Sequence, residues 1–270
     1  MNTFYIVTNH TKDKDGKTTE YIRQYLTQRG CTCAEEITQD VECIIVLGGD
    51  GTVLRAATDN LGKDIPLIGV NLGTLGYLAE VDRESINTAL DKLIGGQFEI
   101  ESRMMLTGTP FINGNNRCSV TALNDIVINR KGSLHVIFYK IYVNGHLLNT
   151  YNADGLIVAT PTGSTAYNLS AGGPIVEPKA RLVVLTPVCS HNPMNNRSII
   201  LSEEDVIDIV IGENKEGEEQ EIEASFDGHC PVSLKTGDSV RIICSDQVTK
   251  IIKLSKVSFL ETLHKKMSGM

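Results

Sequence analysis

The sequence predicts an α/β domain built on a Rossmann-like parallel sheet, followed by a mostly β domain. In the first third of the chain, short apolar runs alternate with segments of helical spacing, which is typical of a parallel sheet covered by helices. After the Gly95-Gly96 pair, helical patterns nearly disappear and β-rich runs separated by turn signals follow. We therefore expect one domain over residues 1–98 and a second over residues 99–256.

The elements of the first domain follow from these patterns in order. The apolar runs predict strands, and the segments between them predict helices with one apolar face. The expected strands are 4–7, 43–47 and 67–70, and the expected helices are 18–28, 52–58 and 85–93.

The second domain is expected to be almost entirely β. Asn144-Gly145 between two β-rich runs predicts a hairpin turn. A short helix is expected over residues 165–170, where Thr160-Pro161-Thr162-Gly163-Ser164 ends a strand. The expected strands are 123–128, 136–143, 155–160, 182–186, 205–211 and 240–244, and a last helix is expected over 259–266.

Composition excludes several classes of partner. Acidic residues outnumber basic residues by 33 to 25, and there is no Trp, so a nucleic-acid-binding protein is not expected. No stretch reaches the roughly 18 apolar residues of a spanning helix, and no leader pattern is present, so we expect no membrane partner and a cytoplasmic location. The seven Cys residues include no Cys-x-x-Cys pair; Cys31 and Cys33, in an expected polar loop, do not predict a metal site.

The sharpest motif is Gly48-Gly49-Asp50-Gly51-Thr52, where a strand runs into a helix. Glycines let a ligand approach the backbone closely, and the helix start offers free N–H groups to a phosphate. Asp50 would then lie beside the phosphates, where a carboxylate is useful for proton transfer or for a metal ion. The alternative is a tight turn in which Gly and Asp are ordinary residues.

Three further clusters carry polar groups. Asn124-Asp125, beside an apolar strand, could hold a ribose diol, although Asn-Asp is also a common turn dipeptide. Asn152-Ala153-Asp154 precedes the Gly-, Ser- and Thr-rich stretch 160–174, whose backbone and hydroxyl groups could donate to ligand oxygens. Asp227-Gly228-His229 by itself indicates a simple turn.

Taken together, these motifs resemble the NAD kinase family over essentially the whole chain. The resemblance rests on GGDGT at 48–52, GTLGYL at 73–78, LND at 123–125, DGH at 227–229 and, most specifically, TPTGSTAYNLSAGGP at 160–174. It implies transfer of phosphate from ATP to the adenosine-ribose 2'-hydroxyl of NAD, giving NADP. It also implies that residues 1–98 bind nucleotide, that 99–256 bind NAD, and that 257–270 return to the first domain.

The resemblance also implies roles for individual residues. Asp50 matches the carboxylate at the 2'-hydroxyl, Gly51 lies under the nucleotide, and Arg55 suits a phosphate. Asn152 stands where several family members have Arg or Gly. The remaining implied NAD contacts are Asn124, Asp125, Asp154, Thr165, Ala166, Tyr167, Asn168, Leu169, Ser170 and Asp227.

The implied chemistry needs few protein groups. A carboxylate in reach of the ribose hydroxyl can take its proton. Mg2+ or another divalent metal, bound through the ATP phosphates without protein ligands, would neutralise developing charge. Two alternatives share features of the sequence: a lipid or sphingoid kinase with the same glycine motif, and a dinucleotide-binding sensor without turnover. The resemblance and the unpaired strand edges lead us to expect a homotetramer or homodimer.

Overall fold

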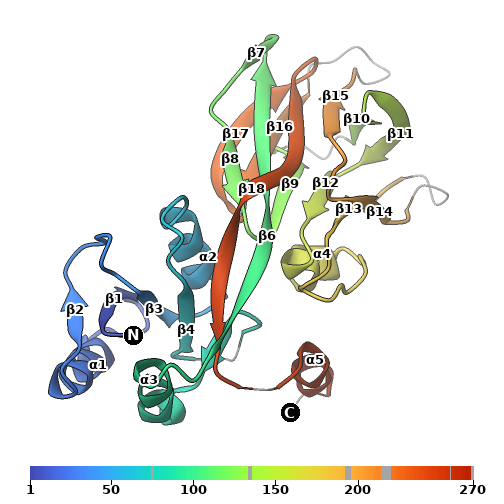
Figure 1. The fold of residues 1–270 in the computed structure, drawn as a ribbon. Helices are drawn as coiled ribbons and strands as arrows, with labels where there is room; N and C mark the ends of the chain where they lie inside the picture. The colour runs from blue at the N-terminus through green and yellow to red at the C-terminus, as the bar shows by residue number, and fades with distance from the viewer. Residues whose placement is uncertain (74–75, 133–135, 192–195, 214–219, 256, 269–270) are drawn as a thin grey trace. The chain divides into compact units, whose positions relative to one another are not determined.

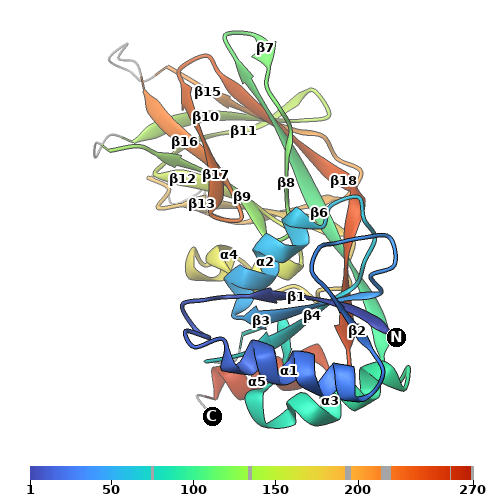
Figure 2. The ribbon, with the colours of Figure 1, turned by 90° about the vertical axis from the view of Figure 1, so that its left-hand side faces the viewer.

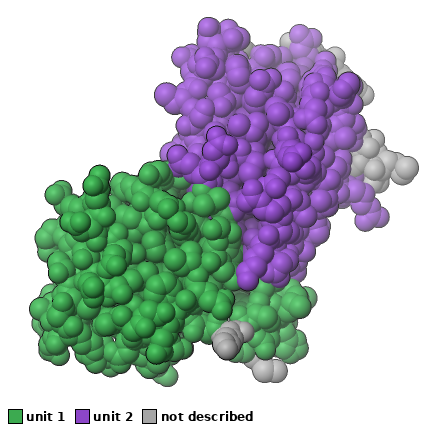
Figure 3. Space-filling view, in the orientation of Figure 1, with its two compact units in different colours: residues 1–103, 248–270 green, residues 104–247 purple. Residues whose placement is uncertain are grey.

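The structure is a computed structural model that describes residues 1–270 except 74–75, 133–135, 192–195, 214–219, 256 and 269–270. It divides into two compact units, shown in Figure 3. Unit 1 comprises Met1–Arg103 and Val248–Met270, and unit 2 comprises Met104–Gln247. Two long strands, β6 (Glu99–Ile112) and β18 (Ser239–Lys253), belong partly to each unit. The sequence placed the corresponding boundaries at 98 and 257, near the ends of these strands.

Unit 1 is an α/β unit with a parallel sheet in the order β18-β4-β3-β1-β2. The central strand β3 is buried along its whole length, because parallel strands are covered on both faces. Figures 1 and 2 show α1 and α3 on one face of the sheet and α2 on the other. The elements of unit 1 are β1 (Thr3–Thr8), α1 (Lys17–Gln28), β2 (Thr32–Ala34), β3 (Cys43–Gly48), α2 (Asp50–Asp59), β4 (Leu67–Asn71), β5 (Ala79–Val81), the 3-10 turn η1 (Arg83–Ser85), α3 (Ile86–Ile94) and α5 (Phe259–Met267).

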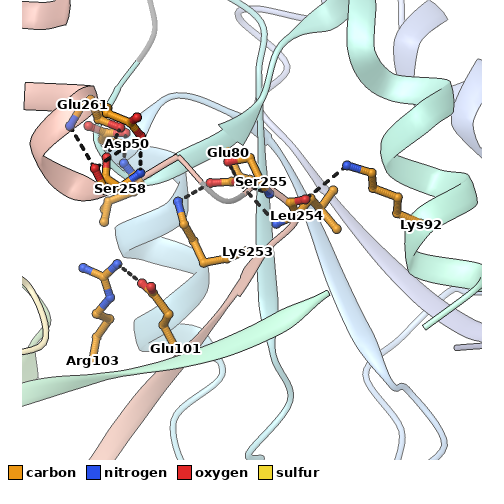
Figure 4. Close-up of polar contacts among 12 residues, drawn as sticks. Asp50, Glu80, Lys92, Glu101, Arg103, Lys253, Leu254, Ser255, Ser258 and Glu261 are labelled. Carbon is orange, nitrogen blue, oxygen red and sulfur yellow. Dashed lines mark hydrogen bonds and ion pairs between the residues drawn. The ribbon is translucent and has the colours of Figure 1, made fainter. Parts of the chain in front are cut away.

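The C-terminal segment belongs to unit 1. Glu80 fixes the end of β18: its carboxylate pairs with Lys253 and accepts from the backbone N–H of Ser255 at 2.9 Å (Figure 4). Helix α5 begins with a capping box in which Ser258 and Glu261 exchange hydrogen bonds. The Glu80 contacts tie the chain after β18 to unit 1, and the capping box fixes where α5 begins.

Unit 2 is mostly β, as the sequence predicted, and its strands pair in antiparallel fashion. One sheet has the order β14-β13-β12-β9-β16-β17, and a second set of paired strands runs β11-β10-β15-β18, with β6 beside β18. The hairpin predicted at Asn144-Gly145 is confirmed, since both residues have positive φ angles. The elements of unit 2 are β7 (Asn115–Asn116), β8 (Val120–Ala122), β9 (Asp125–Arg130), β10 (Ile137–Val143), β11 (His146–Ala153), β12 (Gly155–Ala159), η2 (Thr162–Thr165), α4 (Tyr167–Ser170), β13 (Leu182–Val188), β14 (Ile199–Ser202), β15 (Ile207–Ile211), β16 (Glu221–Phe226) and β17 (His229–Lys235).

Strand β12 explains how unit 2 positions its Gly- and Ser-rich stretch. Leu156 and Val158 face the main core, whereas Ile157 and Ala159 face a smaller cluster on the other side of the sheet. Residues that follow the strand, including Val176, cover this second face. Stretch 160–174 is therefore held against the sheet as part of a packed layer.

Two local expectations need correction. The helix expected over 165–170 is two separate short turns, η2 and α4, because Ala166 between them has a ψ of -129° and leaves the helical region. Cys31 and Cys33 do not lie in a polar loop: Cys31 is buried and Cys33 lies within β2. The sequence around them is polar, but these side chains pack with the apolar core of unit 1.

Candidate active site

In unit 1, the predicted site lies where β3 ends and α2 begins. The strand ends at Gly48, and a Cβ atom at this position would lie 2.3 Å from the Thr52 hydroxyl, so only glycine fits. Gly49 is extended, with φ -106° and ψ -172°, and Asp50 is the first residue of α2. The carboxyl ends of parallel strands meet at one edge of a sheet, which is where ligands bind in such folds.

The Asp50 carboxylate does not cap its own helix. Its two oxygens accept hydrogen bonds from the backbone N–H groups of Tyr77, at 2.8 Å, and Leu78, at 3.0 Å. Gly76 makes this contact possible, because a Cβ atom there would lie 1.8 Å from Asp50 Oδ1. The loop after β4 therefore fixes the direction of the side chain.

These contacts explain why two glycine motifs occur in one chain. The carboxylate comes from GGDGT, and its partners come from the end of GTLGYL. Thr74 and Leu75 of the second motif lie outside the described residues. The turn-only interpretation of Asp50 does not account for these long-range bonds.

The other predicted residues of unit 1 lie on α2. Gly51 is exposed, with open space around it, so a ligand can approach its backbone. The Arg55 side chain is 78% exposed and its Nε lies 3.7 Å from the carboxylate of Asp59, one turn along the helix. Such an exposed pair contributes little stability, so the guanidinium is free to exchange this partner for a phosphate.

In unit 2, Asp227 brings two predicted clusters together. It lies in the turn between β16 and β17 with a φ of 51°, and its carboxylate accepts backbone N–H groups of Leu123 and Asn124, both at 2.7 Å, and of Asp125 at 3.1 Å. The DGH segment is thus a turn, as its residues indicate. It also holds the LND segment in place.

The carboxyl groups of Asp125 and Asp227 are both in an environment that opposes ionisation. Burial, and then the negative charge of Asp227, raises the pKa of Asp125 to about 7. Burial also raises the pKa of Asp227, although the three N–H donors act in the opposite direction. At neutral pH, Asp125 can therefore either donate or accept a hydrogen bond.

Stretch 160–174 packs directly on the LND segment. The Thr160 hydroxyl donates to the carbonyl oxygen of Leu123 at 2.6 Å and accepts from the backbone N–H of Gly163 at 3.0 Å. Gly163 lies against Asn124 so closely that a Cβ atom would be 2.0 Å from its carbonyl oxygen. Asn124, Asp125, Asp227 and the start of this stretch therefore form one cluster.

The predicted residues within 165–170 differ in what they can offer a ligand. The Asn168 amide is fully buried and is used internally: it donates to the carbonyls of Ser164 and Pro174 and accepts from Thr186. Its observed role is therefore to hold the stretch together. Thr165 and Ala166 are half-buried, whereas Tyr167, Leu169 and Ser170 are exposed.

Asn152 and Asp154 lie away from this cluster within unit 2. Asp154 precedes β12, pairing with Arg130 at 3.4 Å, whereas Thr160 follows the same strand. At about 3.3 Å per residue, these two ends of β12 are about 20 Å apart. Asn152 is exposed on β11, near the Asp154 end. Within one chain, Asn152 and Asp154 therefore lie far from Asp125 and Asp227.

Two residues in the loop after β1 also lie at this site, although the sequence did not predict them. Asn9 donates its amide to the Thr52 hydroxyl at 3.1 Å, and the Lys12 ammonium lies beside Gly49. The signal available in the sequence was position: both residues follow a strand that pairs with β3, so they emerge at the same edge of the sheet. Among the described residues, no group of three His, Cys, Asp or Glu side chains could hold a metal ion.

Comparison with known proteins bears on the whole chain. Residues 4–98 match the ATP-NAD kinase N-terminal domain, and residues 123–254 match the ATP-NAD kinase C-terminal domain. NAD kinases of Lachnospira eligens and Agathobacter rectalis are 44% and 45% identical, and the alignments cover 99% and 100% of this chain and 100% and 99% of those relatives.

Solved structures share the fold. A yeast NADH kinase complexed with NADH aligns with a TM-score of 0.84 over 99% of this chain and 88% of its own, at 23% identity. An NAD kinase from Archaeoglobus fulgidus in complex with ATP aligns with a TM-score of 0.79 over 99% of both chains, also at 23% identity. No helix within the described part of the chain is long and apolar enough to cross a membrane. With relatives this similar along its full length, the chain belongs to the ATP-NAD kinase family.

Proposed function

We propose that this protein transfers the γ-phosphoryl group of ATP to the adenosine-ribose 2'-hydroxyl of NAD, giving NADP and ADP. The observation that carries the proposal is the Asp50 carboxylate, held at the carboxyl edge of a parallel sheet by Tyr77 and Leu78 in a chain of the ATP-NAD kinase family. The alternatives of a lipid kinase and of a sensor without turnover are not supported by these relatives.

Asp50 is the proposed general base. Each carboxylate oxygen has two lone pairs, and each accepts one backbone N–H, so a second lone pair remains for a ribose hydroxyl. As the hydroxyl oxygen bonds to the γ-phosphorus and the bond from phosphorus to the bridging oxygen of ADP breaks, the hydroxyl proton passes to Asp50. The two fixed N–H bonds keep the carboxylate in one orientation during this transfer.

The remaining predicted residues are proposed to bind and orient the dinucleotide. Asn124 and Asp125 offer an amide and a carboxyl group to the ribose and the base, and Asp227 holds their backbone. Tyr167, with neighbouring Thr165 and Ala166, offers an exposed surface to the adenine and ribose. Gly51 and Arg55 are proposed to face phosphate. Asn152 and Asp154 lie at the other end of β12, so they are proposed to contact NAD only from a second copy of this chain in the expected oligomer.

Magnesium is proposed to enter with ATP. Among the described residues no group of three His, Cys, Asp or Glu side chains could hold the ion, so the nucleotide phosphates are proposed to supply its ligands. When bound, the ion would neutralise charge on the phosphates. A cytoplasmic location and a homotetramer or homodimer stay predictions.

The test is direct. The purified protein is incubated with NAD, ATP and MgCl2, and NADP is measured with an NADP-specific dehydrogenase. We expect NADP to accumulate in proportion to enzyme concentration. A parallel incubation with radiolabelled ATP and sphingosine or diacylglycerol tests the lipid-kinase alternative. Labelled lipid without NADP would overturn the proposal, and binding of NAD without either product would indicate a sensor.

A further inference from the structure

Lys12 places a positive charge on the glycine turn that carries Asp50. Its Nζ atom lies so close to Gly49 that a Cβ atom there would be 2.9 Å away, and it would be 3.6 Å from a Cβ atom at Gly73. The ammonium therefore stands between the loop after β3 and the loop after β4. It approaches both at glycines, where the backbone is uncovered.

The loop that carries Lys12 is fixed on both sides. The Asn9 backbone N–H donates to Leu47 at 2.9 Å, and its side chain bonds Thr52, so the start of the loop is tied to β3 and α2. The end of the loop is tied to α1 by buried Asp13, whose carboxylate accepts the backbone N–H of Thr19 at 2.9 Å. The Lys12 side chain is exposed, so only this flexible side chain needs to move to meet a ligand.

The Lys12 charge has no counter-ion among the described residues. No carboxylate of these residues lies within the 4.0 Å of an ion pair, whereas Lys17 in the same segment pairs with Asp15 at 3.0 Å. The Asp50 carboxylate, next to Gly49 in the chain, accepts its hydrogen bonds from Tyr77 and Leu78 instead. An exposed ammonium beside uncovered backbone at a glycine turn is suited to a phosphate group, for which lysine supplies a mobile point charge.

We propose that Lys12 Nζ binds a phosphate group lying on the Gly49–Thr52 turn, and that this contact contributes to binding the phosphorylated substrates. The inference rests on the proposed function. The phosphate belongs either to ATP or to the diphosphate of NAD, and both present the same chemistry to the ammonium. Lys12 adds a second cation to the turn beside Arg55, which already has Asp59 as a partner.

The experiment compares Lys12→Met, Lys12→Arg and Lys14→Met. Lys14→Met is the matched control, because Lys14 is exposed in the same loop and its loss changes the net charge equally. Binding of tripolyphosphate, ATP and NAD is measured by calorimetry, and KM for each substrate is measured in the NADP assay. Lys12→Met should weaken tripolyphosphate binding about 10- to 100-fold, the usual range for a hydrogen bond to a charged group.

The binding measurement for each ligand has a defined interpretation. Weaker ATP binding assigns the phosphate to the donor, and weaker NAD binding assigns it to the dinucleotide; either supports the proposal. Lys12→Arg should recover most of the loss, and Lys14→Met should stay within about twofold of the unmodified protein. Unchanged binding of all three ligands by Lys12→Met would overturn the Lys12 proposal. Absence of NADP with the unmodified protein would instead overturn the proposed function, while tripolyphosphate binding still tests Lys12.

Discussion

Replacing Gly76 with alanine tests whether the orientation of Asp50 matters, without removing its carboxylate. The added Cβ atom would lie 1.8 Å from Asp50 Oδ1, 2.3 Å from Cγ and 2.5 Å from Oδ2. Gly76 does not have a positive φ angle, so the backbone accepts alanine. The collision with the carboxylate is therefore the main effect of the substitution.

The expected magnitude follows from these distances. Non-bonded carbon and oxygen atoms need about 3.0 Å or more, so the carboxylate must move by more than 1 Å relative to the backbone that holds it. The hydrogen bonds from Tyr77, at 2.8 Å, and Leu78, at 3.0 Å, cannot survive such a shift. A displacement of about 1 Å in a catalytic group can cost about 100-fold in rate. We expect a fall of about this size in kcat.

The assay is steady-state NADP formation, with the dissociation constant of NAD measured separately. Gly73→Ala is the control in the same loop, because its Cβ atom would meet nothing closer than Lys12 Nζ at 3.6 Å, an ordinary contact. We expect Gly73→Ala to keep kcat within about threefold, and both variants to bind NAD. A Gly76→Ala enzyme with normal kcat would show that the observed Asp50 orientation is not the one used in catalysis.

Three further predictions concern unit 2 and assembly. The pKa of Asp125, about 7, exceeds its ordinary value of 3.8, so the contribution of this carboxyl group to stability is fully present below pH 3.8 and is lost as the pH rises through about 7. In Asp125→Asn, the melting temperature should therefore depend less on pH between 3.8 and 7. The same pH dependence in the variant and the unmodified protein would contradict the prediction. Gly163→Ala should destabilise unit 2 by about 1–3 kcal/mol in thermal unfolding, because its Cβ atom would overlap the Asn124 carbonyl; an unchanged melting temperature would refute this. Light scattering should give two or four times the 29.5 kDa mass of one chain, and a mass near 29.5 kDa would exclude the expected oligomer.

The central strands were predictable because their residues are buried on both faces. The run CIIVLG in β3 is apolar throughout, and its burial is complete. Strand β6 was not predicted, since its first residues are charged; Glu101 and Arg103 form an ion pair with little exposure, which the sequence does not reveal. The second half of β18 was not predicted either, because its residues are mostly polar. It joins the sheet of unit 1 through a single pairing of Ile251 with Leu67, which the sequence does not reveal.

The site was predictable in its residues but not in its contacts. The glycines around Asp50 indicated close approach of a ligand, but its partners Tyr77 and Leu78 lie 27 and 28 residues away along the chain. Asp227 likewise matched a motif, and only the fold reveals that it holds the LND segment. Asn168 illustrates the limit of motif reasoning, because a residue within a binding stretch is used for packing and internal hydrogen bonds.

The proposal that Asp50 removes the ribose proton is tested most directly by Asp50→Asn. The amide has one acceptor oxygen, so one of the two N–H groups from Tyr77 and Leu78 loses its partner, and thermal unfolding must first establish that the variant is folded. Asp40→Asn, at an exposed position of the same unit, controls for the substitution itself.

The measurement is kcat for NADP formation together with the dissociation constant of NAD for the same folded preparations. If Asp50 is the general base, Asp50→Asn lowers kcat by about 100- to 10,000-fold while NAD binding is retained, and Asp40→Asn is unaffected. A folded Asp50→Asn enzyme with near-normal kcat would contradict the role of Asp50 as the group that takes the proton.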